Sequence, residues 1–468
     1  MIKEIPHNMG GSLTDDFQPS AVCKFLDLPP VSLRNLRATA DKNSPRHTTT
    51  QLCGISLRKY RTKRRYVWRC LFRQLHPANF LTYLNETCII HGEAINLNFK
   101  ALTEYMDSLA AVGVPGCDLA VCRDHEPVYR HMSGHRDAMG VTPVQGDELY
   151  WLYSCTKVFT TCSAMQLIEK GALSLDDPVS AYLPAFGNLT VKEGDVVRPA
   201  RRVMTVRHLM SMQSGLDYDM TTPAARAELA RTKGQATTRQ LVEAKAGDPL
   251  CFEPGTDFLY SLSHDVLAAV IEVASGMRFS DYLRRHIFEP LGLKDTGFFP
   301  SAEAEARLCA QYVFNGEKQR PEPCAVMDNS YRFTPVYESG GAGLFSGVGD
   351  CIAFADALAC GGGGLLSPEM VQLWSANQLG PKSRATFDAW QRLGYSYGLG
   401  VRTRVNTAIG GRGQIGEFGW DGAAGSWMMI DPVNHISAFY AMHVRDFAYC
   451  YDVIHPKLRD LIYKGFEA

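Results

Sequence analysis

Hydrophobic positions become regularly spaced from residue 98 onward. The first predicted helix follows from apolar side chains at helical spacing, namely Phe99, Leu102, Met106 and Leu109. A Pro115-Gly116 step ends this helix. Two strand-like segments follow, 117–123 and 127–133, with Asp124-His125-Glu126 between them. This order predicts a helix followed by a β-hairpin.

The C-terminal end of the chain has a similar pattern. Segments 425–430 and 436–443 flank a polar turn at 431–435, and 456–466 is typical of a closing helix. A helix and a hairpin at each end favour one antiparallel sheet that is built from both ends of the chain and covered by helices.

The middle of the chain, 159–339, is mostly helical with breaks at glycine and proline. The segments with helical spacing are 206–212, 238–246, 264–274 and 281–289. We therefore expect an α/β region formed by 98–158 and 340–468, and a helical insertion at 159–339. Together they make one catalytic unit, 98–468, whose substrate site lies in the crevice between its two parts.

Charge and cysteine usage narrow the class of protein. The 468 residues include 48 Lys and Arg against 49 Asp and Glu, which leaves a net charge of −1. No global field attracts nucleic acid or anionic lipid. The 14 cysteines are scattered without metal-ligand spacing. With no apolar leader and no run of spanning length, we expect a soluble cytoplasmic protein without a nucleic-acid or membrane partner.

Residues 1–97 differ from the rest. Basic side chains alternate with aromatic ones between Arg58 and Arg73, a pattern that can bind nucleic acid or a membrane surface. A solvated tail, or sequence that is not part of the catalytic fold, explains the same pattern. We expect an N-terminal extension outside that fold.

The sharpest chemical signal is Ser154-Cys155-Thr156-Lys157, at the start of a predicted helix. Positions three apart share a helix face, so the Lys157 amine can reach the Ser154 hydroxyl. A serine hydroxyl becomes a good nucleophile only when a base takes its proton. Lys157 can serve as that base if burial lowers its pKa toward neutrality. By itself this tetrapeptide is weak evidence for a catalytic site, because serine and lysine three residues apart occur by chance in most chains of this length.

Two later segments support the interpretation of this tetrapeptide as part of a catalytic site. In 252–263 a Pro254-Gly255 turn leads to Tyr260, about a hundred residues after the serine. In 416–425, on a predicted late strand, glycine permits close backbone approach, and the Ala423 amide could point at an oxyanion.

Together the three segments resemble the Ser-x-x-Lys, Tyr-x-Asn and Lys-Thr-Gly elements of the penicillin-binding-protein/β-lactamase superfamily, especially its class C and family VIII esterase branch. The resemblance covers about 98–445 and includes 206–209, 214–216, 290–293 and 340–344. It implies an α+β fold, a β-lactamase/transpeptidase-like α/β/α sandwich with a central antiparallel sheet and a helical insertion region.

The resemblance also implies roles for individual residues. Ser154 would be acylated, with Lys157 and Tyr260 sharing the proton transfers and the backbone amides of Ser154 and Ala423 forming the oxyanion hole. Tyr260 would protonate the leaving group and then act as base for water, unless it is an ordinary core tyrosine. The residues expected to line the substrate are Tyr153, Leu262, Trp420, Asp421 and Gly422.

Two departures from the family pattern concern the substrate. Leu262 stands where class C β-lactamases place an amide-binding Asn, and Trp420 stands where they place the cationic Lys of the third element. An indole cannot supply the charge that holds the carboxylate of a β-lactam or a peptidoglycan terminus. Related esterases and acyltransferases show similar variants.

We therefore expect a serine hydrolase that acts through a Ser154 acyl-enzyme on a small-molecule carboxylic ester, without a cofactor. The alternatives are an acyltransferase to an alcohol acceptor, a β-lactamase or D-Ala-D-Ala peptidase, and a non-catalytic binding module of the same fold.

Two other patterns could indicate a different nucleophile or a metal site. Gly394 to Gly398 fits the Gly-x-Ser-x-Gly elbow around Ser396, but tyrosines flank the serine and a strand-like segment follows, so we interpret it as a decoy. His131 and His135 are four apart in a turn-like context that does not favour a metal-binding helix. No metal site is predicted.

Overall fold

The computed structural model describes residues 88–90, 93–95, 97–324, 329–390 and 392–467. The chain divides after Leu75, and every described residue belongs to the second unit, His76–Ala468. The expected extension at 1–97 lies outside the described residues, apart from Leu97 and a short hairpin. This hairpin pairs β1 (Cys88–Ile90) with β2 (Glu93–Ile95) in antiparallel fashion.

A seven-stranded sheet forms the centre of the second unit, and all its pairings are antiparallel. In spatial order its strands are β11 (Tyr395–Tyr397), β12 (Arg402–Arg404), β13 (Phe418–Asp421), β14 (Trp427–Asp431), β15 (Ile436–Met442), β3 (Gly116–Arg123) and β4 (Glu126–Gly134). The predicted hairpins at both ends of the chain thus meet in one sheet, where β3 pairs with β15 along seven residues, as in Leu119 opposite Tyr440.

The sheet is buried on both faces. Along β15, Ala438, Tyr440 and Met442 belong to one hydrophobic cluster, whereas Phe439 and Ala441 belong to another. Because successive side chains of a strand point to opposite faces, the two clusters lie on the two sides of the sheet. This burial explains why β15 reads as a continuous apolar run.

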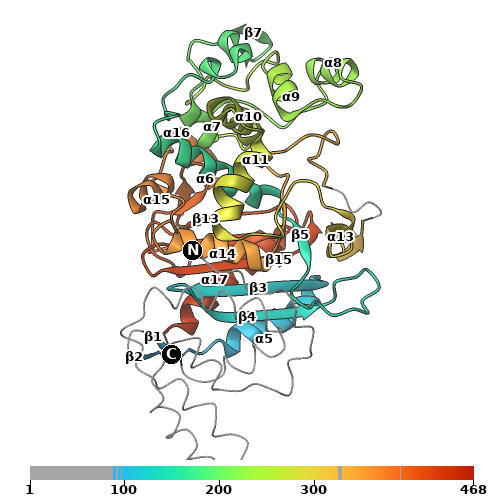
Figure 1. Ribbon diagram of the computed structural model, residues 1–468, viewed down its shortest axis with the longest axis vertical. Coiled ribbons are helices and arrows are strands. Elements are labelled where there is room, and N and C mark those ends of the chain that lie inside the picture. Colours follow the sequence, from blue (N-terminus) through green and yellow to red (C-terminus); the bar gives the residue numbers. More distant parts are fainter. Residues whose placement is uncertain (1–87, 91–92, 96, 325–328, 391, 468) are drawn as a thin grey trace, which may run out of the picture. The chain divides into compact units, whose positions relative to one another are not determined.

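Helices from both ends of the chain complete the layers (Figure 1). On one face α5 (Lys100–Ser108) packs on β4 and against α17 (His455–Gly465). On the other face α14 (Val348–Ala359) packs on β3, β14 and β15, and α6 (Thr156–Glu169) packs against α14. This arrangement confirms the predicted α+β fold with a central antiparallel sheet.

The helices of the middle segment are α7 (Val206–Met210), α8 (Pro223–Arg231), α9 (Thr238–Lys245), α10 (Ser263–Ser275), α11 (Phe279–Leu283), α12 (Glu289–Leu291) and α13 (Ala302–Glu305). In Figure 1 the helices α7, α8, α9 and α10 lie above α6, whereas α13 lies lower. Of these, α10 packs directly on α6. The helical segment thereby borders the helix that begins next to Ser154.

The single helix predicted at 281–289 is interrupted. A π-helical turn, η5 (Arg284–Phe288), separates α11 from α12. A second π-helical turn, η6 (Cys450–Ile454), precedes α17. Each turn ends two residues before a proline, Pro290 or Pro456. Because proline has no N–H and its ring collides with the carbonyl four residues earlier, the preceding turn widens.

Short elements connect the layers. The remaining helices and turns are α15 (Pro368–Ser375), α16 (Pro381–Asp388), η1 (Leu109–Val112), η2 (Tyr153–Cys155), η3 (Val179–Ala181) and η4 (Pro184–Asn188). The remaining strands are β5 (Leu149–Trp151), β6 (Thr190–Glu193), β7 (Val196–Pro199), β8 (Tyr312–Asn315), β9 (Arg320–Pro323), β10 (Phe345–Gly347) and β16 (Val444–Arg445).

Two general features concern the described residues. None of their helices combines the length and the apolar character needed to cross a bilayer. Every cysteine among them whose side chain is described is a free thiol.

The contact between α6 and α14 offers a test of this architecture. The rings of Phe159 and Phe354 stack with centroids 4.0 Å apart, and both residues are fully buried. Phe354→Ala leaves a cavity there, so we expect a loss of about 3–5 kcal/mol in the free energy of unfolding, measured by urea titration. Phe299→Ala, at a residue 39% exposed, is the matched control and should cost less than about 1 kcal/mol. Equal losses in both variants would contradict the packing described.

Candidate active site

The nucleophile candidate, Ser154, lies where strand β5 turns into helix α6. β5 pairs with β10, and the Leu152 amide donates to the carbonyl of Leu344, which fixes the approach to the turn. Tyr153 then adopts a φ of +46°, a conformation that non-glycine residues rarely take. The tyrosine is fully buried and its hydroxyl donates to Gln311. This packing holds Ser154 at the beginning of the helix.

Lys157 reaches Ser154 from the first turn of α6. Its Nζ lies 3.2 Å from Ser154 Oγ and 3.1 Å from the hydroxyl of Tyr218, and it donates to the carbonyl of Gly341 at 2.7 Å. The lysine side chain is fully buried. Its three hydrogen-bond partners are neutral, so no partner in direct contact compensates the charge of an ammonium.

This environment lowers the pKa of Lys157. Burial is the main cause and brings the pKa to about 7, while the negative charge of Asp265 opposes the shift. Asp265 is itself buried and accepts from Ser339 at 2.6 Å. A Cβ at Gly341 would lie 2.6 Å from Asp265 Oδ2 and 3.4 Å from Lys157 Nζ, so the glycine permits this close approach. At neutral pH a large fraction of Lys157 is therefore an unprotonated amine, able to take a proton.

Tyr260 lies beside both residues. The indole N–H of Trp420 donates to its hydroxyl at 2.8 Å, and Lys157 Nζ lies 4.5 Å from its ring centroid. Burial raises the pKa of Tyr260, although hydrogen bonds with Ser154 and Trp420 act in the opposite direction. The phenol is thus protonated at neutral pH and can donate a proton, while Lys157 is the group that titrates near pH 7.

The turn after β13 lies against the nucleophile segment. The Ser426 hydroxyl donates to the Leu152 carbonyl at 3.0 Å, and the Gly422 amide donates to the Ser426 carbonyl at 2.8 Å. A Cβ at Gly422 would lie 2.2 Å from the oxygen of Leu152, so only glycine fits. Among the described residues we find no acceptor for the Ala423 amide. The Ala423 N–H is thus not used within the described residues, as a donor to an oxyanion requires.

Asp421 has a different environment from the one expected of a residue that contacts substrate. Its carboxylate pairs with Arg402 at 2.9 Å and with Arg392 at 3.1 Å. Burial alone would raise the pKa of Asp421, but the two arginines hold it well below the usual range. Both oxygens are engaged within the protein, which indicates that Asp421 supports the end of β13.

The other predicted residues fall in separate places. Leu262 is buried at the start of α10, where its amide donates to the Asp217 carbonyl at 3.3 Å. Ser396 is fully buried within β11 and its hydroxyl bonds to Asn377, so the second serine motif forms a strand and not an elbow. His131 lies in β4, where it bonds to Asp107 at 2.7 Å.

The structure adds aromatic residues that the motifs did not indicate. Tyr218 contacts Lys157 and has its ring centroid 5.9 Å from that of Tyr260. Trp390 lies 5.3 Å from Tyr260 between centroids, and Tyr397 packs edge-on against Trp420 at 5.0 Å. Tyr218 comes two residues after the segment 214–216, so its place in the sequence was the available signal. These rings surround the reactive groups with apolar surface.

The burial of Lys157 predicts how stability depends on pH. Between about pH 7 and 10.5 the lysine is neutral in the folded protein and protonated in the unfolded chain, so unfolding takes up a proton. Lys157 therefore makes the free energy of unfolding rise by up to about 1.4 kcal/mol per pH unit in this window. Lys157→Met should lack this contribution, so its free energy of unfolding should rise less steeply with pH than that of the wild type. Urea titrations at pH 7.5, 8.5 and 9.5, which divide that window in roughly even steps, measure the two slopes.

Lys245→Met is the matched control. Lys245 is also buried, but it pairs with Asp217 and Asp248, which raise its pKa. It stays protonated in both states across this window, so its removal should leave the slope unchanged. Equal slopes in wild type and Lys157→Met would show that the amine is charged in the folded protein.

Comparisons with known proteins agree with this geometry. A family model described as Beta-lactamase matches residues 100–449. Protein Rv1367c of Mycobacterium tuberculosis is 30% identical over 324 residues, which cover 66% of this chain and 80% of the relative. Esterase EstB of Burkholderia gladioli is 29% identical over 344 residues, which cover 68% of this chain and 82% of the esterase.

Among solved structures, "EstCE1, a hydrolase with promiscuous acyltransferase activity" aligns with a TM-score of 0.64 and 25% identity, covering 78% of this chain and 97% of EstCE1. The predicted superfamily is thereby confirmed. The chain belongs to the beta-lactamase family and is an enzyme of the serine hydrolase type.

Proposed function

We propose that this enzyme cleaves carboxylic esters of small molecules through an acyl-enzyme on Ser154. The observation that carries the proposal is the Lys157 amine, which has a pKa of about 7 and lies 3.2 Å from Ser154 Oγ. A base matched to neutral pH and within hydrogen-bond distance is what activation of a serine requires.

In the first half-reaction Lys157 takes the proton of Ser154 as Oγ attacks the ester carbonyl carbon. The amides of Ser154 and Ala423 stabilise the resulting oxyanion. When this intermediate collapses, the bond between the carbonyl carbon and the alcohol oxygen breaks. Tyr260 donates its proton to the departing oxygen, which leaves a phenolate next to the Lys157 ammonium. Nζ of Lys157 lies 4.5 Å from the centroid of the Tyr260 ring, so the two groups are neighbours.

The second half-reaction restores both groups. The Tyr260 phenolate takes a proton from water as the water oxygen attacks the acyl carbon. Collapse of the second intermediate breaks the bond to Ser154 Oγ, which takes the proton back from the Lys157 ammonium. Each group ends in its starting state, and the products are the carboxylic acid and the alcohol.

The pocket supports an ester over a β-lactam. Trp420 occupies the position of the cationic residue in the third family element, and its N–H is already bonded to Tyr260. The neighbouring rings of Tyr218, Trp390 and Tyr397 extend the apolar surface. The relative named Esterase EstB has the same kind of activity as the one we propose.

Transfer of the acyl group to an alcohol is a second candidate activity. The similar EstCE1 carries the description of a hydrolase with promiscuous acyltransferase activity. An alcohol that replaces water in the second half-reaction would use the same groups, and the choice depends on how well the pocket excludes water. A non-catalytic role is disfavoured because Ser154, Lys157 and Tyr260 are all present and lie together.

Covalent labelling tests the proposed nucleophile. We expect a fluorophosphonate to add one adduct per chain, seen by intact-mass analysis, with peptide mapping to Ser154. Ser154→Ala should lose the adduct and all but a trace of ester hydrolysis, since it lacks the attacking oxygen. Ser396→Ala, at the other motif serine, is the control and should label as wild type. An adduct that persists in Ser154→Ala and maps to Ser396 would overturn the assignment.

Competing substrates test the chemistry of the pocket. We expect kcat/KM for a p-nitrophenyl ester to exceed that for a chromogenic cephalosporin by at least about 100-fold, the equivalent of about 2.7 kcal/mol in transition-state binding. The reason is that Trp420 offers no cation to the β-lactam carboxylate. Added short alcohols, followed by product analysis, would divide hydrolysis from acyl transfer. Faster turnover of the cephalosporin would contradict the proposed ester specificity.

A further inference from the structure

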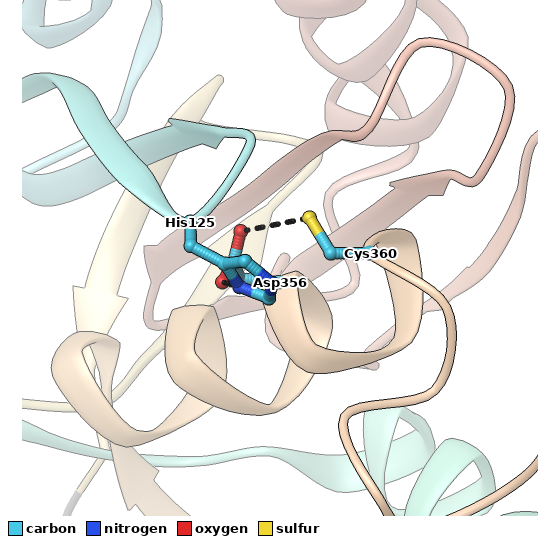
Figure 2. A group of neighbouring side chains, drawn as sticks. All are labelled: His125, Asp356 and Cys360. Atoms are coloured by element: carbon cyan, nitrogen blue, oxygen red, sulfur yellow. Dashed lines mark hydrogen bonds and ion pairs between the residues drawn. The ribbon is translucent and has the colours of Figure 1, made fainter. Parts of the chain in front are cut away.

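Three side chains from two distant parts of the sequence meet in a cluster (Figure 2). His125 lies in the tight turn between β3 and β4, with a φ of +67°. Asp356 lies in the last turn of α14 and Cys360 follows the end of that helix. The aspartate and the cysteine are four residues apart, so both project from the same side of the helix end toward the turn.

The three groups lie close enough together to serve as ligands of one metal ion. His125 Nδ1 lies 2.8 Å from Asp356 Oδ2, and Cys360 Sγ lies 3.6 Å from Asp356 Oδ1. One nitrogen, one oxygen and one sulfur atom of the cluster all lie within 4.8 Å of one another. Neighbouring ligands of a tetrahedral zinc ion are roughly 3.3–3.8 Å apart, given bond lengths of about 2.0–2.3 Å. Small side-chain rotations bring the three atoms to these separations.

The donor set is also specific. Imidazole nitrogen, carboxylate oxygen and thiolate sulfur are the three ligand types that zinc takes in proteins, whereas magnesium and calcium prefer oxygen alone. Burial raises the pKa of the Cys360 thiol to about 12, but a backbone hydrogen bond from His125 acts in the opposite direction. A divalent cation binds the thiolate and displaces its proton, which reverses the effect of burial.

The neighbouring hairpin, β14–β15, provides an internal comparison. His435 lies in the turn between β14 and β15 with a φ of +53°, and its Nδ1 lies 2.8 Å from Asp124 Oδ1. This pair has the same distance and the same half-exposed histidine as the pair of His125 with Asp356. Among the described residues, no third metal-ligating side chain joins this pair to make a group of three. The cysteine is therefore what distinguishes the first cluster from an ordinary ion pair.

We propose that His125, Asp356 and Cys360 form a site for one zinc ion, with water as the fourth ligand on the exposed side of the histidine. The ion would connect the β3–β4 turn to the end of α14, the helix that covers one face of the sheet. It would act on the stability of the fold, because its ligands come from the β3–β4 turn and the end of α14 and not from the segments that carry Ser154, Lys157 and Tyr260. The proposal does not depend on the ester-cleaving activity.

Cobalt(II) titration of the full-length protein, stripped of metal beforehand, tests the site. Cobalt replaces zinc in tetrahedral sites and shows a sulfur-to-cobalt charge-transfer absorption when a thiolate is bound. We expect this band to saturate at one equivalent and to disappear when zinc is added. Cys360→Ser should abolish the band. Asp356→Asn and His125→Asn should each weaken cobalt binding by at least about 10-fold. Loss of a residue that only hydrogen-bonds to a metal ligand already weakens binding by about this factor, so loss of a ligand itself should cost at least as much.

His435→Asn is the matched control, since asparagine tolerates a positive φ in both turns, and it should bind cobalt as the wild type does. Circular dichroism of each metal-free variant verifies that the fold is retained. An undiminished charge-transfer band in Cys360→Ser would place the thiolate ligand elsewhere in the chain. The absence of any band in the wild type would show that the cluster is an ion pair with a neighbouring thiol, and either result overturns the proposal.

Discussion

The chemistry of this enzyme depends on one unfavourable placement, the burial of the Lys157 amine among neutral partners. An ammonium in that position has no carboxylate in direct contact, so burial lowers its pKa to about 7. Asp265 lies next to Gly341, and its negative charge stabilises the protonated amine. The pKa of Lys157 therefore falls less than burial alone would lower it. The amine is therefore poised between the two protonation states that proton transfer requires.

The rest of the structure holds that arrangement in place. The pairing of β5 with β10 directs the chain into the strained Tyr153 and then into α6. The turn after β13 is bound to Leu152 through Ser426, and two arginines around Asp421, of which Arg402 is buried, support its beginning. One side of the site is thus built on the small two-stranded sheet of β5 and β10, and the other on the seven-stranded sheet, whose two buried faces resist deformation.

Replacement of a lysine by Trp420 in the third family element changes the electrostatics of the pocket. A cation at this position attracts a substrate carboxylate, whereas the indole directs its only donor to the Tyr260 hydroxyl. This hydrogen bond lowers the pKa of a phenol that burial would otherwise raise further. In the proposed mechanism the indole would therefore influence a proton transfer through Tyr260 and would not bind an anion.

Local patterns in the sequence were sufficient for much of this protein. The spacing of apolar residues predicted the helices and hairpins at both ends of the chain, because periodicity reflects which side of an element is buried. The Ser-x-x-Lys spacing placed Lys157 near Ser154, because one helical turn separates them. Ser396 could be set aside because its neighbours favour a strand, as observed in β11.

Only the tertiary structure decided the features that depend on distant segments. Tyr218 and Gly341 reach Lys157 across 61 and 184 residues, and Arg402 reaches Asp421 from a neighbouring strand. His125 and Asp356 are separated by 231 residues. The sequence by itself determined the elements and the pair of reactive groups on one helix, since those are fixed by short-range geometry. The pKa of Lys157 and the meeting of His125 with α14 follow from burial and packing, which arise only when the sheet has brought the two ends of the chain together.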